Sequence, residues 1–323
     1  EWLTDWSSAD CLSEISFDLG GGVGPLEAEH SSESEPRDIF FSDVIEVRGK
    51  CLVCRVLGCI VDIFDISPLA ECLVSWRVVL PSPVVNDIGV SHVCGLDGLG
   101  ACIMFLTKGH SVHRVQISLG SLTPVLVAAG STDCHLVEAP SAFCALSEDV
   151  AAIACFDGTL RIMRLGIGEY ELVDTSLLRR FVHGLVTQVQ PAVMALAVAG
   201  SGASGLRLLA FSADGQLRLW EVLERRGYLL ASDAVESSDP LASHVGTSSV
   251  YMRMSPDSSR ACLVLGNTVH LIRLPDGSQS DSKLELEELE PPFSNAVPSL
   301  VALSQSGLWS FWSGPNREQL FHL

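Results

Sequence analysis

The stretch AFSADGQLRLWEV at residues 210–222 decides the fold of this chain. It reads as an apolar run, a tight Asp214-Gly215 turn, and a second run in which side chains alternate in character from Leu217 to Trp220. An Asp-Gly pair favours a tight hairpin turn because glycine tolerates the positive φ that the turn requires. Alternation places the two sets of side chains on opposite faces of a sheet. The stretch therefore predicts a β-hairpin.

The same pattern occurs six times along the chain. Each copy has a glycine at its turn, and successive glycines are 51, 49, 57, 51 and 41 residues apart. The copies are residues 54–66, 105–117, 154–165, 210–222, 264–274 and 302–312, with turn glycines Gly58, Gly109, Gly158, Gly215, Gly266 and Gly307. One hairpin cannot bury both of its faces, whereas sheets repeated at this spacing bury each other when they stack around an axis. The pattern predicts an all-β protein, a β-propeller of about seven blades with at least six hairpin repeats.

Two further strand-like segments, Glu14–Leu19 and Arg77–Leu80, could supply a seventh blade or close the ring. The alternative architecture is a pair of β-sandwiches, which would show turns every ~8 to 12 residues without the longer period. The long period favours the propeller. We expect residues 1–323 to form a single propeller domain.

Two segments read as excursions from the blades. Residues 20–38 are rich in Gly, Ser and Glu, and residues 278–292 are strongly acidic. Both are expected to be solvated loops rather than docking peptides. The second could also hold a helical turn or an edge strand, which Pro291 and Pro292 would end.

Composition limits the classes of partner. The 39 acidic and 20 basic side chains give a net charge of −19, so phosphate backbones would be repelled and direct nucleic-acid binding is not expected. Residues 191–200 form the longest nearly pure apolar run, about half the roughly 20 residues that a spanning helix needs. The chain begins at Glu1 with no basic and apolar leader, so we expect it to be part of a longer protein.

Cysteine usage favours a reducing compartment. The chain has 11 cysteines, an odd number, and no Asn-x-Ser/Thr glycosylation site. Several lie inside apolar strand-like runs, where a thiol acts as a small hydrophobic side chain. These are Cys54, Cys59, Cys102, Cys155 and Cys262. The pattern indicates the cytosol or nucleus rather than secretion.

Two motifs resemble ligand sites and are judged structural. Residues 200–205 match G-x-G-x-x-G, but Leu206 begins another strand-like run instead of the helix that a dinucleotide site requires. Cys51 and Cys54, and His110 and His113, have metal-ligand spacing. However, residues three apart on a strand point to opposite faces, and the two pairs are far apart in sequence.

No G-x-S-x-G element opens a helix, and the adjacent carboxylates Glu287 and Glu288 lie in an acidic run where nothing indicates a raised pKa. We therefore predict no catalytic, cofactor-binding or metal-binding residue. Trp220, Trp309 and Trp312 end predicted hairpins and are expected to pack between blades.

Several segments, in order, resemble the N-terminal propeller of the nucleoporin 160 family, related to the fungal nucleoporin 120 proteins. Residues 6–19 resemble its early acidic, Leu-rich segment, and residues 105–118 resemble its strand pair with a Val-His-Arg core. Residues 209–222 and 301–312 resemble two later blades. The matching positions are Ser111, Val112, His113, Arg114, Asp214, Leu217, Arg218, Trp220, Leu303, Trp309 and Trp312. Regular Gly-His and Trp-Asp signatures of WD40 blades are missing, as they are in the nucleoporin propellers.

The resemblance implies a structural role without catalysis. It implies a scaffold of the Y-shaped outer-ring complex of the nuclear pore, at the nuclear envelope, supporting mRNA export and protein import. The implied partners are other outer-ring nucleoporins, including small propeller nucleoporins, in a large hetero-oligomer without a transmembrane segment of this chain. A helical domain would follow the propeller in the full protein.

Two other functions remain open. The repeat alone agrees equally well with a propeller hub of another intracellular assembly, such as a coat, a ciliary transport complex or a ubiquitin ligase adaptor. A propeller enzyme would instead need polar side chains or a metal converging in a central channel.

Overall fold

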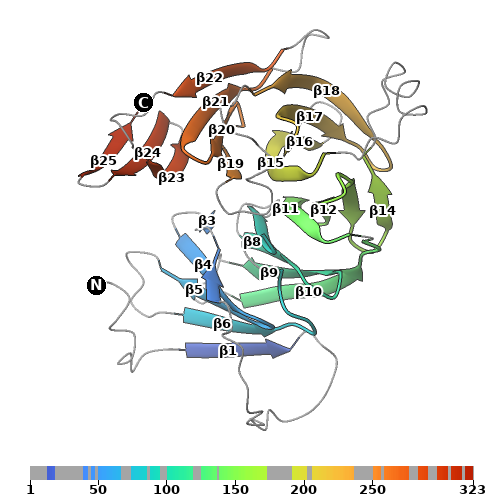
Figure 1. Cartoon of the computed structure of the whole chain (residues 1–323). Helices are drawn as coiled ribbons and strands as arrows, with labels where there is room; N and C mark the ends of the chain where they lie inside the picture. Colours follow the sequence, from blue (N-terminus) through green and yellow to red (C-terminus); the bar gives the residue numbers. More distant parts are fainter. Residues whose placement is uncertain are drawn as a thin grey trace. The chain divides into compact units, whose positions relative to one another are not determined.

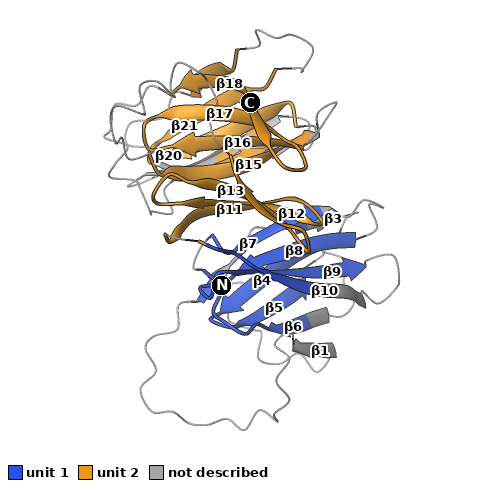
Figure 2. Ribbon diagram, turned by 90° about the vertical axis from the view of Figure 1, so that its right-hand side faces the viewer, with its two compact units in different colours: residues 1–135 blue, residues 136–323 orange. Residues whose placement is uncertain are grey.

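The computed structural model describes residues 13–18, 39–42, 45–47, 50–66, 74–85, 88–94, 100–118, 125–136, 138–172, 191–201, 206–235, 250–255, 258–275, 283–289, 297–304, 307–314 and 317–322. These residues form strands and turns, and none of them forms a helix. Accordingly, within this part of the chain no helix has the length and apolar character to cross a membrane. The chain divides into two compact units, Glu1–His135 and Leu136–Leu323, each described by itself below (Figure 2).

The first unit contains two sheets. The first sheet has the strand order β1-β6-β5-β4-β2, with β3 also paired to β4, and the second sheet has the order β10-β9-β8-β7. The strands of the first sheet are β1 (Ser13–Asp18), β2 (Ile39–Phe41), β3 (Ile45–Val47), β4 (Lys50–Leu57), β5 (Ile60–Asp65) and β6 (Val74–Val79). Those of the second are β7 (Val90–Cys94), β8 (Gly100–Leu106), β9 (Ser111–Ser118) and β10 (Val125–Asp133).

The second unit contains four sheets, each with its strands in sequence order. The third sheet consists of β11 (Pro140–Ser147), β12 (Val150–Cys155), β13 (Leu160–Arg164) and β14 (Gly168–Glu171). The fourth consists of β15 (Val193–Ser201), β16 (Leu206–Ser212), β17 (Gln216–Val222) and β18 (Gly227–Ala234). The fifth consists of β19 (Val250–Met254), β20 (Arg260–Leu265), β21 (Thr268–Arg273) and β22 (Glu285–Leu289), and the sixth of β23 (Val297–Ser304), β24 (Gly307–Gly314) and β25 (Arg317–His322).

All six predicted hairpins are confirmed (Figure 1). They are the antiparallel pairs β4-β5, β8-β9, β12-β13, β16-β17, β20-β21 and β23-β24. In the four-stranded sheets each hairpin is the central pair, so a further strand joins it on either side. The repeat of about 50 residues is therefore one small antiparallel sheet.

The segments considered for a seventh blade lie in the first sheet instead. Strand β1, from Ser13 to Asp18, pairs in parallel with β6, and β6 pairs antiparallel with β5. Within the described residues there are six sheets. Part of the acidic segment 278–292 is a strand rather than the expected solvated loop, because β22 forms the edge of the fifth sheet, as the edge-strand alternative predicts.

Alternation along the strands places apolar side chains on both faces of the fourth and fifth sheets. In the fourth sheet, Leu208, Ala210 and Trp220 pack against the third sheet. Their neighbours in sequence, such as Leu209 and Leu219, pack against the fifth sheet. The fifth sheet likewise packs against the fourth through Leu263 and against the sixth through Cys262 and Val264. In the first unit, Trp76 and Ile103 belong to one core between the first and second sheets. The cores therefore lie between sheets, because a sheet with apolar side chains on both faces needs a neighbour on each side to bury them.

The turn chemistry agrees with the sequence in four of the six hairpins. Gly58, Gly158, Gly215 and Gly266 have positive φ, at 62°, 85°, 77° and 57°. Asp214 fixes its turn because its Oδ1 accepts a hydrogen bond from the Gln216 backbone N–H at 3.1 Å. The carboxylate of Asp157 does the same for Thr159 at 2.9 Å. Asp-Gly therefore acts as the sequence predicted.

The second hairpin differs in detail. Its residue with positive φ is His110, at 58°, rather than Gly109. A Cβ at Gly109 would lie 3.0 Å from the Ser82 Cβ, so a larger residue there would crowd Ser82. Glycine lies at this turn as predicted, but the reason is close packing rather than a positive φ.

Candidate functional site

The G-x-G-x-x-G stretch and the Cys and His pairs, which resemble ligand sites in the sequence, lie on strands or in the connections between them. Gly200 lies in β15, and Ser201 pairs with Leu206 of the antiparallel strand β16. The G-x-G-x-x-G stretch therefore connects two antiparallel strands, as predicted, although residues 202–205 lie outside the described residues. A pyrophosphate site would need a helix N-terminus after the glycines.

Cys51 and Cys54 both lie on β4, whereas His110 is in the β8-β9 turn and His113 is on β9. Within the described ranges, no group of three or more His, Cys, Asp or Glu side chains could hold a metal ion. Burial raises the pKa of the Cys54 thiol to about 12, against the opposing effect of a hydrogen bond with Ser42. Cys54, Cys102, Cys155 and Cys262 are buried on strands, as predicted for cysteines that act as small hydrophobic side chains. Cys59 differs, because it lies in the turn between β4 and β5 and is half-buried.

His113 belongs to a buried hydrogen-bond network that closes the β8-β9 turn. Its Nε2 lies 2.8 Å from the Ser111 Oγ, and that oxygen lies 2.8 Å from the Thr107 Oγ1. Burial lowers the pKa of His113, and the charge of Asp133 opposes this shift only in part. The imidazole is therefore neutral near pH 7 and acts as a structural hydrogen-bonding group. Sequence reasoning singled out His113 but did not find this network.

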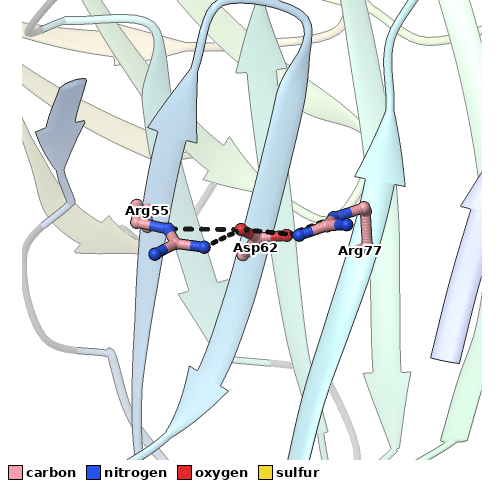
Figure 3. Close-up of polar contacts among 3 residues, drawn as sticks. All are labelled: Arg55, Asp62 and Arg77. Atoms are coloured by element: carbon pink, nitrogen blue, oxygen red, sulfur yellow. Dashed lines mark hydrogen bonds and ion pairs between the residues drawn. The ribbon is translucent and has the colours of Figure 1, made fainter. Parts of the chain in front are cut away.

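A second polar cluster, which sequence reasoning missed, crosses the first sheet. Asp62 on β5 lies between Arg55 on β4 and Arg77 on β6, which are its direct cross-strand partners (Figure 3). The Arg77 Nε donates to Asp62 Oδ1 at 2.7 Å, and the Arg55 Nε donates to Oδ2 at 3.2 Å. Burial alone would raise the pKa of Asp62, but the hydrogen bonds and charges of Arg77 and Arg55 lower it overall. The available signal was a carboxylate inside the apolar run 60–66.

The fourth sheet carries a related but local pair. Arg218 on β17 donates to Asp214 Oδ2 at 3.0 Å and to the Ser212 Oγ at 2.9 Å. The third sheet has the same Asp-x-x-x-Arg spacing, yet its Arg161 pairs with Glu169 on β14 at 3.0 Å. These charges support hairpins and strand pairs.

The predicted packing of the tryptophans is confirmed where their side chains are described. Trp220 is 4% exposed in the core between the third and fourth sheets. Trp312 is 2% exposed in the core between the fifth and sixth sheets. The side chain of Trp309 lies outside the described residues.

Large hydrophobic side chains are also exposed on the surface. Among the described residues these are Ile39, Ile66, Phe156, Ile167, Tyr228 and Leu230. Ile167 and Ile39 are the most exposed, at 72% and 58%. Tyr228 is partly covered by the Arg226 guanidinium, 5.0 Å from its ring centre.

Comparison with known proteins places the fold. No family model matches the chain, and no curated protein matches it. The β-propeller domain of Cps50 (Swd1) from Myceliophteria thermophila matches with 12% identity and a TM-score of 0.51, over 88% of this chain and 86% of that one. The chain has a β-propeller fold. The prediction of an all-β propeller is thereby confirmed, and the alternative of paired sandwiches is excluded by the separate small sheets.

Raptor from Chaetomium thermophilum is also similar, with 12% identity and a TM-score of 0.51 over 90% of this chain. The chain spans only 24% of the length of Raptor. At such low identity both likenesses concern the fold alone. The resemblance to the nucleoporin 160 family therefore rests on the sequence segments.

Proposed function

We propose that this propeller is a structural scaffold nucleoporin of the outer-ring, Y-shaped complex of the nuclear pore. It would act by protein–protein interaction, support mRNA export and protein import, and have no catalytic activity of its own. Its partners would be other outer-ring nucleoporins, including small propeller nucleoporins, at the nuclear envelope.

The observation that carries this proposal is the ordered sequence resemblance, mapped onto the hairpins. Its most specific segment, Ser111 to Arg114, begins β9, where Ser111 and His113 form the buried turn network. The Asp214 to Trp220 segment forms the β16-β17 hairpin, where Arg218 bonds Asp214 and Trp220 fills an inter-sheet core. These matched residues support the blades themselves, so the resemblance concerns features on which this propeller depends.

The chemistry of the described residues supports a binding role. Shifted pKa values arise at the buried thiol of Cys54, at Tyr170, and at His113 and Asp62, which bond within a turn and across strand pairs. The hydroxyl of Tyr170, for example, bonds to the Leu223 carbonyl and so links the third sheet to the fourth. Such groups stabilise a scaffold.

Localisation tests the proposal. The chain is tagged with a fluorescent protein at its own locus and imaged together with a marker of the nuclear envelope. The proposal predicts a punctate nuclear rim that coincides with nuclear pores. A signal confined to vesicles, cilia or the diffuse cytosol would contradict it and favour a hub of another assembly.

A further inference from the structure

Each of the first five sheets has an ionisable side chain as the second or third residue of the strand that follows its central turn. These residues are Asp62, His113, Arg161, Arg218 and His270, on β5, β9, β13, β17 and β21. Both histidines follow a hydroxyl residue and a valine, as Ser111-Val112 and Thr268-Val269. The second and fifth sheets therefore differ from the third and fourth, where arginine stays charged across the physiological range of pH.

The two histidines make the same contact. The His113 Nε2 lies 2.8 Å from the Ser111 Oγ, and the His270 Nε2 lies 3.2 Å from the Thr268 Oγ1. A hydroxyl of each set also binds a backbone carbonyl at the turn, at 3.2 Å from the Thr107 Oγ1 and at 3.0 Å from the Thr268 Oγ1. We call the two sets, Thr107–Ser111–His113 and Thr268–His270, the histidine latches. Each histidine latch joins a turn to the strand that leaves it.

Each histidine latch lies beside an edge strand. His113 is the register partner of Ser131 on β10, and His270 is the register partner of Glu288 on β22. Among the described residues, β10 and β22 each pair with a single strand. An edge strand is held by one ladder of hydrogen bonds, so it opens locally at a lower cost in free energy than a central strand.

The closed sheets disfavour a charged imidazole at both latches. His113 is 3% exposed and His270 is 4% exposed. A charged imidazole is a donor at both ring nitrogens. In the part of the chain that the structure describes, the buried Nδ1 of His113 has no hydrogen-bond partner. A proton on that nitrogen would therefore leave a buried donor without an acceptor, which is unfavourable.

Few charged groups share the buried face of His113. Strand register places His92 on β7 and Asp133 on β10 on the face of the second sheet that packs against the first. From the first sheet, Lys50 and Asp65 lie on the facing side and pair with each other at 3.2 Å. Asp133 acts to raise the pKa of His113, against the larger, opposite effect of burial.

The fifth-sheet latch has a similar balance. Its charged neighbour within the sheet is Glu288, which acts to raise the pKa of the histidine against the larger, opposite effect of burial. The fourth sheet contributes Arg207, Glu221 and Asp233 to the face that packs against the fifth. Asp233 lies 3.6 Å from Lys283. At both latches, burial therefore outweighs the one carboxylate that favours the charged imidazole.

We propose that the two histidine latches form a conformational device that responds to acid: protonation of His113 and His270 releases the edge strands β10 and β22, whereas β14 and β18 stay paired. The imidazole of an opened strand reaches water and binds the proton more readily, so the open form gains population as the pH falls below about 6.5. Release of an edge strand exposes the backbone donors and acceptors of β9 or β21 to pairing with another strand. This inference does not depend on the assembly to which the chain belongs.

Hydrogen–deuterium exchange of the whole purified chain at pH 7 and pH 5.5 tests the proposal. Mass spectrometry reads peptides from each edge strand, and the rates are corrected for the intrinsic dependence of exchange on pH. An ordinary histidine pKa of about 6.5 in the open form limits the rise in the opening equilibrium to about eightfold between these pH values. We expect corrected exchange to rise about two- to eightfold in β10 and β22, with no rise in β14 and β18.

Three glutamine variants assign the effect to the latches. His270→Gln keeps a polar side chain that does not titrate, so the rise in β22 should disappear while the rise in β10 remains. His113→Gln should give the reverse result. His92→Gln is the matched control, because this histidine is in the second sheet but in neither latch, and it should leave both rises unchanged. Thermal unfolding at pH 7 checks the fold of each variant.

Several results would overturn the inference. A uniform rise in all four edge strands would show global rather than local opening. No rise in β10 and β22, a rise in only one of them, or a rise in β22 that persists in His270→Gln would each contradict the device. If a glutamine variant does not fold, the comparison of the four edge strands in the wild-type chain still decides the question.

Discussion

At the scale of single residues, Asp62 shows how a strand tolerates a buried carboxylate. The charges and hydrogen bonds of Arg77 and Arg55 outweigh burial and lower the pKa of Asp62. Asp62→Asn is therefore expected to lower the free energy of unfolding at pH 7 by about 1–3 kcal/mol, less any screening of the half-exposed arginines. Urea unfolding measures this. Glu285→Gln is the control, because that side chain is 73% exposed and lies 3.6 Å from Arg273.

The effect of Asp62→Asn should also depend on pH. Because the pKa in the folded state lies below the unfolded value of about 3.9, the ionised carboxylate stabilises the fold above that value. The stabilisation is lost as the pH falls through the folded pKa. The difference between wild type and Asp62→Asn should therefore shrink in acid. A constant difference from pH 7 down to pH 3 would contradict the ion-pair account.

His113 gives a second prediction of pH dependence, with the same sign but at a higher pH. Burial lowers its pKa, so the unfolded chain binds this proton first as the pH falls below about 6.5. Stability should decline between pH 7 and pH 5, and His113→Gln should reduce that decline in Tm.

His270→Gln should remove a further part of the decline in Tm between pH 7 and pH 5. Burial lowers the pKa of His270 as well, against the opposing charge of Glu288. If neither variant changed the pH dependence, the neutral buried histidines would not be its cause.

At the scale of elements, the cores between sheets carry the stability. Trp220 on β17 is 4% exposed and packs against the third sheet. Trp220→Ala should cost about 3–5 kcal/mol, because the cavity can collapse only in part. Tyr228→Ala on the neighbouring edge strand β18 should cost under about 1 kcal/mol, since that ring is 39% exposed. Chemical denaturation of both variants compares them, and similar losses would show that Trp220 is not a core residue.

The hairpin turns give a second element-level test. Gly215 has a φ of 77°, so Gly215→Ala should cost about 1–2 kcal/mol. Gly130→Ala on β10 is the control, because its nearest contact would be the Arg114 guanidinium at 3.9 Å. The change in Tm measures both. A fully tolerated Gly215→Ala would mean that the turn can adopt another conformation.

The elements differ in how far the sequence predicts them. The six hairpins were predictable because Asp-Gly turns and alternation are local signals, as at Asp214-Gly215. The pairing of β1 with β6 was not, because it joins residues 13–18 to 74–79 through parallel register rather than a turn. The cluster of Arg55, Asp62 and Arg77 was not predictable either, because it depends on the register of three strands. The Thr107–Ser111–His113 network was missed because its members look like ordinary strand polar residues until the turn brings them together.

At the scale of the whole molecule, small antiparallel sheets with two apolar faces explain how a repeat of about 50 residues builds a propeller. They also explain why many strand residues are apolar.

The most direct measurement of the central claim is affinity purification of the chain, tagged at its own locus, followed by quantitative mass spectrometry. The account predicts that outer-ring nucleoporins, including small propeller nucleoporins, are enriched over an untagged control. Their stoichiometry should be near that of the chain itself. Enrichment of a coat, ciliary or ubiquitin-ligase assembly, with no outer-ring nucleoporin above background, would contradict it.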